Sequence, residues 1–341
     1  MRKERIYMGK GHIAVNNYIR DKARFADMIN GHFFSGRQVV LPEQLEEVSG
    51  EYEILLEDKG GKTSKLEHYR DVIMRWNNEV DFCFFACENQ EEIHYAMPVR
   101  DMLYDGLSYT RQIIELWKSH NKGVGEGLET AEYLSRFRKG DKIFPVLTVV
   151  FYYGSEPWDR NQDLYSKFQL SEPLKDLLKE YVPNYWINLF TADNIENLEY
   201  FKTDLQKIIG MLKCKKDKEK LLKYVHRNED FFGEVDYNTQ RAIAEFLQSE
   251  PFAKKIVRRK SKEAKYNMCK ALDDLYQEGV EKGRAEMRNA LDDLYQKGIE
   301  KGRVEMLRDF VFRKIQKGNT IEEIADMLEE SVDVVKEIAK Q

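Results

Sequence analysis

Apolar and polar residues follow one another in patterns that predict an α/β domain in the first part of the chain. Apolar positions across residues 12–34 recur at helical spacing and predict one helix. Two apolar runs, Val72–Trp76 and Val80–Ala86, are separated by three polar residues, as expected of a β-hairpin. A helix should begin at Pro98, and the apolar run over residues 143–153 is typical of a strand covered on both faces. A strand, a helix and a buried strand in that order indicate a right-handed crossover between parallel strands.

The rest of the chain has a helical pattern and contains a repeat. The segment Ala271–Arg284 recurs 19 residues later as Ala290–Arg303. Its glycines each weaken a helix by ~1 kcal/mol relative to alanine, so we expect a loosely ordered, solvent-rich connector that is able to self-associate. The sequence thus predicts four parts: an α/β domain over residues 1–165, a helical domain over 166–265, the repeat-containing connector over 266–317 and a short helical tail over 318–341.

The tail is expected to form two short helices. Thr320 and Glu323 have the spacing of a capping box at the start of the first helix. Two short helices could also form a helix-turn-helix, but the second one carries Asp333 and Glu337 beside Lys336, which suits the major groove of DNA poorly. A small packing module is therefore the favoured interpretation.

Composition and charge set weak limits on function. The chain is 42% hydrophobic and 34% charged, with a net charge of −5, which argues weakly against a nucleic-acid partner. Two lysine-rich runs, over residues 213–223 and 254–265, are locally basic, although a solvated helix face explains either run by itself. No apolar stretch is long enough to span a bilayer and no signal peptide precedes the first helix, so we expect no membrane contact and a cytoplasmic location. Cys83 and Cys87 could form half of a zinc site, but their apolar surroundings favour a buried strand.

The predicted hairpin brings acidic residues together. If the turn is centred between residues 79 and 80, Asp71 lies opposite Glu88, and strand alternation puts Glu88 and Gln90 on one face. Two carboxylates and an amide oxygen would suit a hard cation such as Mg²⁺. Taken alone, this pattern is explained better by ordinary polar residues at strand ends.

Further motifs in the same order give the pattern more weight. They are Tyr69-Arg70-Asp71-Val72, Glu88-Asn89-Gln90, Arg100 with Tyr104 four residues later, and the segment Tyr152-Tyr153-Gly154 followed by Pro157-Trp158. With these motifs the chain resembles the recombination-promoting nuclease (Rpn) family, transposase-like proteins of the PD-(D/E)XK superfamily, over about residues 20–165. The resemblance implies a restriction-endonuclease-like core, a mixed sheet flanked by helices, followed by an α-helical C-terminal region.

The same resemblance implies a metal-dependent DNA endonuclease. Asp71 and Glu88 would ligate Mg²⁺ or Mn²⁺, and Gln90, where many relatives in the superfamily carry lysine, would orient the attacking water. The expected reaction is phosphodiester hydrolysis with little sequence specificity, linked to recombination or mobile elements. Two alternatives stay open, namely a catalytically inactive DNA-binding or assembly protein that keeps the fold, and a phosphodiesterase that acts on RNA.

Four other residues are candidates near this site. Arg100 and Tyr104 lie one helical turn apart and could form a phosphate clamp, with a surface arginine and a half-buried tyrosine as the alternative. Asp27 could supply another acidic group, although solvation on a helix face is the favoured interpretation. His94 could assist proton transfer or be a bystander in a loop.

Overall fold

The computed structural model describes most of the chain, in eight stretches: residues 10–49, 51–57, 63–69, 71–77, 82–120, 129–158, 162–249 and 265–340. Almost all of the predicted basic run over residues 254–265 and the predicted hairpin turn lie outside these stretches. The chain divides into two compact units, Met1–Ala271 and Leu272–Gln341.

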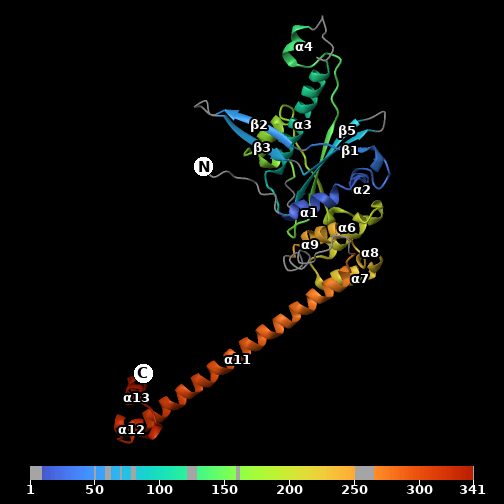
Figure 1. The fold of residues 1–341 in the computed structure, drawn as a ribbon. Coiled ribbons are helices and arrows are strands. Elements are labelled where there is room, and N and C mark those ends of the chain that lie inside the picture. Colours follow the sequence, from blue (N-terminus) through green and yellow to red (C-terminus); the bar gives the residue numbers. More distant parts are fainter. Residues whose placement is uncertain are drawn as a thin grey trace. The chain divides into compact units, whose positions relative to one another are not determined.

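A mixed five-stranded sheet forms the centre of the first unit (Figure 1). Its strand order is β1-β4-β5-β6-β7, with antiparallel pairing from β1 to β5 and parallel pairing from β5 to β7. The strands are β1 (Leu45–Glu47), β4 (Val72–Asn77), β5 (Phe82–Gln90), β6 (Val146–Tyr152) and β7 (Asn188–Thr191). The hairpin and the parallel pair predicted from the sequence are confirmed.

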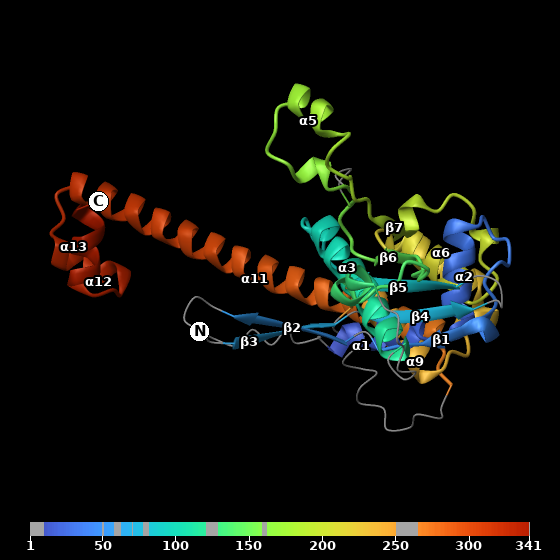
Figure 2. The same cartoon turned by 90° about the horizontal axis from the view of Figure 1, so that it is seen from above.

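Helices cover both faces of this sheet (Figure 2). The long helix α3 (Met97–His120) covers one face, where Met97 packs with Val150 and Leu189. On the other face the Phe151 ring lies edge-on to Phe190 and tilted against Phe246, which belongs to α9 (Tyr237–Phe246). Helix α9 in turn packs against α1 (Lys10–Ile19). This arrangement bears out the predicted mixed sheet flanked by helices.

The single helix predicted over residues 12–34 is wrong. The chain forms two helices, α1 and α2 (Lys22–Phe33), with a break at Arg20 and Asp21. Asp21 starts the second helix because its carboxylate accepts a hydrogen bond from the Arg24 N–H at 3.1 Å. The break turns the chain, so that α1 and α2 contact different parts of the unit.

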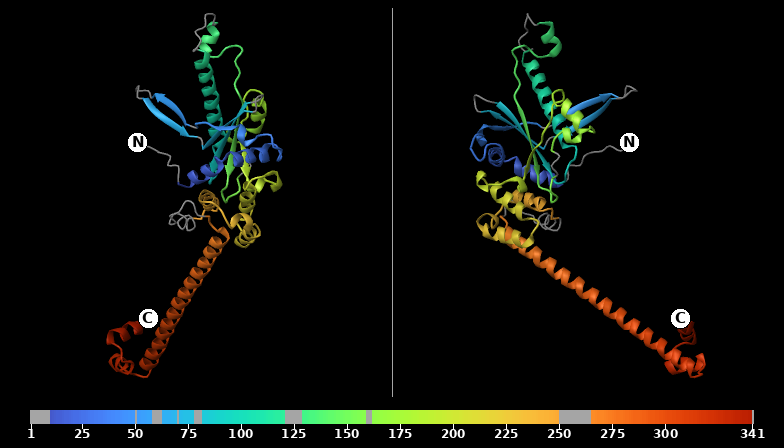
Figure 3. Two further views of the ribbon diagram at one scale, coloured as in Figure 1. Left: turned by 45° about the vertical axis from the view of Figure 1, so that its right-hand side comes forward. Right: turned by 180° about the vertical axis from the view of Figure 1, so that it is seen from behind.

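Further elements complete the first unit. Strands β2 (Glu51–Glu57) and β3 (Thr63–Tyr69) pair with each other in a separate two-stranded sheet (Figure 3). The region predicted as a helical domain supplies the edge strand β7 as well as helices. The remaining helices are α4 (Thr130–Ser135), α5 (Glu172–Leu178), α6 (Leu205–Cys214), α7 (Lys218–Arg227) and α8 (Glu229–Phe232), with short 3₁₀ turns at Pro42–Gln44, Tyr165–Lys167, Ala192–Asn194 and Leu198–Tyr200.

The second unit consists of most of α11 (Met268–Gln316) together with α12 (Ile321–Leu328) and α13 (Val332–Lys340). The loosely ordered connector predicted for the repeat is wrong, because the repeat lies within one continuous helix of 49 residues. The capping box predicted at Thr320 and Glu323 is confirmed. Val311 of α11 packs with Ile324 and Val335 of the two tail helices, as the packing-module interpretation expects. None of the helices in the described stretches is both apolar and long enough to cross a bilayer.

Candidate functional site

The candidate site lies where β5 meets the start of β4. Val72 pairs with Cys87, in the register that puts Asp71 beside Glu88. Asp71 precedes the first residue of β4, so strand alternation does not fix its side chain. Its Oδ2 accepts a hydrogen bond from the Asn89 backbone N–H at 2.8 Å. The sheet therefore holds one carboxylate at the edge of β5, directly beside the position of the other.

Glu88 and Gln90 are both buried on the face of β5 that is covered by α3. Glu88 pairs with Val150 in the parallel register, and Val150 packs against α3. The exposed fraction is 0% for Glu88 and 9% for Gln90. A carboxylate in such surroundings must be compensated by a cation or by hydrogen bonds, because desolvation of its charge is costly.

Arg100 of α3 supplies that compensation. Its guanidinium donates to Glu88 Oε2 at 3.1 Å, and it lies 5.3 Å from the centre of the Tyr104 ring. Burial by itself would lower the pKa of Arg100, but Glu88 and Tyr104 outweigh it and raise this pKa. The two residues predicted as a phosphate clamp thus lie together, and Arg100 contacts a candidate metal ligand directly.

Asn16 of α1 is a site residue that the sequence reasoning missed. Its amide nitrogen donates to Asp71 Oδ1 at 3.1 Å, and its amide oxygen accepts from the Asn89 side chain at 2.7 Å. Asn16 is 1% exposed. The signal in the sequence was an asparagine between the apolar residues Val15 and Tyr18, since a buried polar side chain needs a partner. Asn16 and the Asn89 N–H together fix both oxygens of Asp71.

Asp27 belongs to a different part of the unit. Its carboxylate accepts hydrogen bonds from the backbone N–H groups of Lys202 and Thr203 and from the Thr203 hydroxyl, at 2.6 to 2.9 Å. The side chain is 3% exposed, so the expected solvation on a helix face is wrong. Asp27 fastens α2 to the segment before α6, which leaves its oxygens occupied.

His94 lies close enough to Arg100 to be affected by its charge. Burial lowers the pKa of His94, and the nearby guanidinium lowers it further. The imidazole is therefore neutral at pH 7. A neutral imidazole can accept a proton, so a role of His94 in proton transfer stays a prediction.

The oxygen donors of the site suit a hard cation. Among the residues that the structure describes, no three His, Cys, Asp or Glu side chains form a metal-binding group. A cation here would therefore use the two carboxylates, the Gln90 amide oxygen and water, a donor set that is usual for Mg²⁺. Strand alternation puts the Cys87 side chain on the opposite face of β5 from Glu88, where its thiol lies 3.6 Å from the Asn89 side-chain oxygen. Convergence of Asp71 and Glu88 on one cation stays a prediction.

Comparison with known proteins adds no relative. No family model matches the chain, and no curated protein and no solved structure matches it either. The resemblance to the Rpn family therefore depends on the order of the motifs and is carried forward as a hypothesis.

Proposed function

We propose that the chain is a metal-dependent DNA endonuclease that hydrolyses phosphodiester bonds with little sequence specificity, in a recombination or mobile-element setting. The observation that carries the proposal is the placement of Asp71 beside the buried Glu88 at the end of β5, with Gln90 two residues further along. A buried carboxylate at the end of a strand is costly to keep, and catalytic metal sites are one reason for keeping it.

Each residue has a part in this proposal. Asp71 and Glu88 would hold Mg²⁺ or Mn²⁺, which when bound lowers the pKa of water and neutralises charge on a phosphate oxygen. Gln90 would orient water through its amide, which cannot itself act as a base. Asn16 acts as a positioning residue. It belongs to α1, on the side of the sheet opposite α3, and from there it donates a hydrogen bond to Asp71. Arg100 and Tyr104 would contact a phosphate of the substrate.

The Arg100–Glu88 ion pair supports one rival. An inactive protein that kept the fold could retain a buried glutamate neutralised by an arginine, without any need for a cation. Such a protein would still bind DNA. The proposal and this rival differ in one measurable respect, namely cleavage that depends on the two carboxylates.

Nicking of supercoiled plasmid in Mg²⁺ separates them. Asp71→Asn should lower the rate by more than about 100-fold, since even residues that support metal ligands contribute 10–100-fold. Asp141→Asn is the matched control. Asp141 is also an aspartate of this unit, but it lies outside the candidate site, where its carboxylate is 2.8 Å from the His120 ring nitrogen. The control should nick like the wild type. A wild type that binds DNA without nicking it would favour the rival, and nicking that survives in Asp71→Asn would remove the site assignment. An RNA substrate run in parallel tests the third possibility.

Self-association through the C-terminal helical region is also part of the proposal. Met287, Leu291, Leu294 and Tyr295 of α11 expose 61–69% of their surface. Their spacing puts them on one stripe of the helix, and exposed apolar stripes often mark contacts with another chain. Light scattering of the wild type and of Leu291→Glu/Leu294→Glu tests it. A wild-type monomer at micromolar concentration would contradict it.

A further inference from the structure

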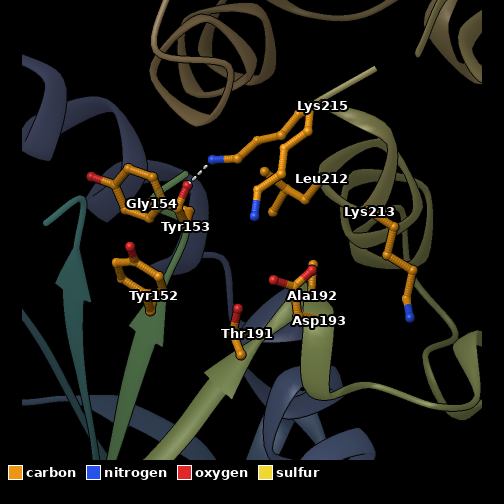
Figure 4. A pocket seen from close by; sticks show the side chains of 10 residues that line it. Tyr152, Tyr153, Gly154, Thr191, Ala192, Asp193, Leu212, Lys213 and Lys215 are labelled. Carbon is orange, nitrogen blue, oxygen red and sulfur yellow. Dashed lines mark hydrogen bonds between the residues drawn. The ribbon is translucent and has the colours of Figure 1, made fainter. Parts of the chain in front are cut away.

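A polar pocket lies next to the candidate site, where the parallel strands β6 and β7 end. Its lining comes from the end of β6 and the two residues after it (Tyr152, Tyr153, Gly154), from the end of β7 and the turn after it (Thr191, Asp193), and from three lysines at and just after the end of α6 (Figure 4). Ligands of α/β proteins commonly bind outside the carboxyl ends of parallel strands. The pocket thus occupies a position at which α/β proteins often bind ligands.

The backbone ties this pocket to the candidate catalytic residues. Tyr152 pairs with Gln90, and the Tyr153 N–H donates to the Gln90 carbonyl at 3.1 Å. The next residue, Gly154, lies so close to the backbone after β5 that a Cβ atom on it would be 2.3 Å from the Glu91 carbonyl oxygen. The strand that carries Glu88 and Gln90 thus pairs directly with the strand whose end lines the pocket.

The lysines of this pocket differ in what their amines do. Lys213 donates to the Ile195 carbonyl, and in Figure 4 its amine points away from the pocket. Lys215 donates to the Tyr153 carbonyl at the wall and keeps two further N–H donors. Lys216 also lines the pocket and is exposed. Two ammonium groups therefore remain available to an anion.

Two positive charges, those of Lys215 and Lys216, face the carboxylates of Asp193 and Glu91 around this pocket. Burial lowers the pKa of Lys215 to about 8, the charge of Lys216 lowers it too, and Asp193 and Glu91 oppose this only in part. Burial and the charge of Glu156 raise the pKa of the Tyr152 hydroxyl, and burial also raises the pKa of the Tyr153 hydroxyl. Both hydroxyls are therefore neutral at pH 7 and add no negative charge. A bound anion would stabilise the charged form of Lys215.

The hydroxyl of Thr191 completes the polar lining. Thr191 is 8% exposed, and Figure 4 shows its hydroxyl pointing into the pocket between the two strand ends. Two ammonium groups and a hydroxyl are donors that suit the oxygens of a phosphate group. The Asp193 carboxylate also lines the pocket, so an anion has to lie on the side of the lysines and Thr191.

We propose that this pocket binds a phosphate group of the nucleic-acid backbone, next to the phosphate that is cleaved. The inference rests on the proposed function for the identity of the polymer, but the pocket itself can be tested without cleavage. An isolated phosphate ion would meet the same donors, so the two sources of phosphate need separate arms of the experiment.

The first arm measures binding of an oligonucleotide to the full chain in EDTA, as a function of salt. Lys215→Gln/Lys216→Gln should remove one phosphate contact, so that raising salt from 50 to 200 mM weakens the variant about threefold less than the wild type. Lys218→Gln/Lys223→Gln removes the same charge from the same lysine-rich run, outside the pocket, and should keep the wild-type salt dependence. Equal changes in both double variants, or none in the pocket variant, would overturn the proposal.

The second arm uses acetylation of lysine amines followed by mass spectrometry. An oligonucleotide, and inorganic phosphate at higher concentration, should protect Lys215 and Lys216 but leave Lys218 and Lys223 reactive. Protection without any plasmid nicking would support phosphate binding by the pocket and contradict the proposed nuclease activity. Nicking without protection would support the nuclease activity and contradict phosphate binding by the pocket. Protection by inorganic phosphate alone would show that the pocket takes a free phosphate and would overturn its role on the polymer.

Discussion

Replacing Arg100 by glutamine tests how far the buried Glu88 carboxylate depends on its guanidinium. The two groups lie 3.1 Å apart, with side-chain exposures of 31% for Arg100 and 0% for Glu88. Removing one partner of a fully buried pair costs ~3–5 kcal/mol, because the other charge stays desolvated. Water reaches part of Arg100, so we expect Arg100→Gln to lose ~2–3 kcal/mol in the free energy of unfolding.

A thermal melt followed by circular dichroism in EDTA measures this loss. At ~2 °C per kcal/mol for a unit of this size, the melting temperature should fall by ~4–6 °C. Arg111→Gln is the matched control on the same helix, because Arg111 pairs with Glu115 and donates to the Ser49 carbonyl at a largely exposed position, with exposures of 42% for Arg111 and 59% for Glu115. An exposed pair contributes less than ~1 kcal/mol, so the control should shift by no more than ~2 °C.

The opposite replacement gives the refuting comparison. Glu88→Gln removes the buried charge and leaves Arg100, whose guanidinium can turn toward water, so it should destabilise less than Arg100→Gln. If Glu88→Gln is the more destabilising of the two, or if Arg100→Gln melts like Arg111→Gln, then Glu88 does not depend on Arg100 for its charge and the reasoning fails.

Three further perturbations have matched controls or internal references. Gly154→Ala should lower the free energy of unfolding, measured in urea, by ~1–3 kcal/mol, because the new Cβ would meet the Tyr152 hydroxyl at 2.2 Å. Its control Gly106→Ala has open space within α3 and should raise this free energy by up to ~1 kcal/mol. Asn16→Ala should lower the free energy of unfolding by ~1–3 kcal/mol, because Asp71 and the Asn89 side chain each lose a hydrogen bond. The control Asn17→Ala, at an exposed position, should change this free energy by no more than ~0.5 kcal/mol. Lys215 has a pKa of about 8 and only its charged form attracts phosphate, so oligonucleotide affinity should fall as the pH rises through 8, and Lys215→Gln should flatten that fall.

The sheet could be predicted from the sequence because its signals are local and strong. The apolar runs of β4 and β5 and the helix that follows them fix the hairpin and the crossover, and the register put Asp71 beside Glu88 as expected. The edge strand β7 was missed because its four residues are too few for a clear periodic signal, and the lysine-rich segments after it favoured a helical interpretation of the whole region.

The contacts of the site were less accessible because they join segments that are distant in sequence. Asn16 reaches Asp71 across 55 positions, and Asp27 reaches Thr203 across 176. Both are polar residues within apolar helix patterns, so their burial could have been suspected, but their partners depend on how α1 and α2 pack. The loosely ordered connector was predicted wrongly for another reason. Once a helix is nucleated, the favourable free energy of propagation along 49 residues exceeds the cost of a few isolated glycines.

The two carboxylates of the site are held by different chemistry, and this gives Arg100 a double role in the proposed reaction. Neutral amide donors from Asn16 and Asn89 hold Asp71, whereas the Arg100 guanidinium holds Glu88. A cation that bound both carboxylates would supply the positive charge that Glu88 now takes from Arg100. The guanidinium, already part exposed and beside Tyr104, would then have donors free for a phosphate. The ion pair and the predicted phosphate clamp are therefore compatible as two states of one side chain. This has a measurable consequence: Mg²⁺ should weaken the dependence of stability on Arg100, so that the difference in melting temperature between the wild type and Arg100→Gln narrows when EDTA is replaced by Mg²⁺.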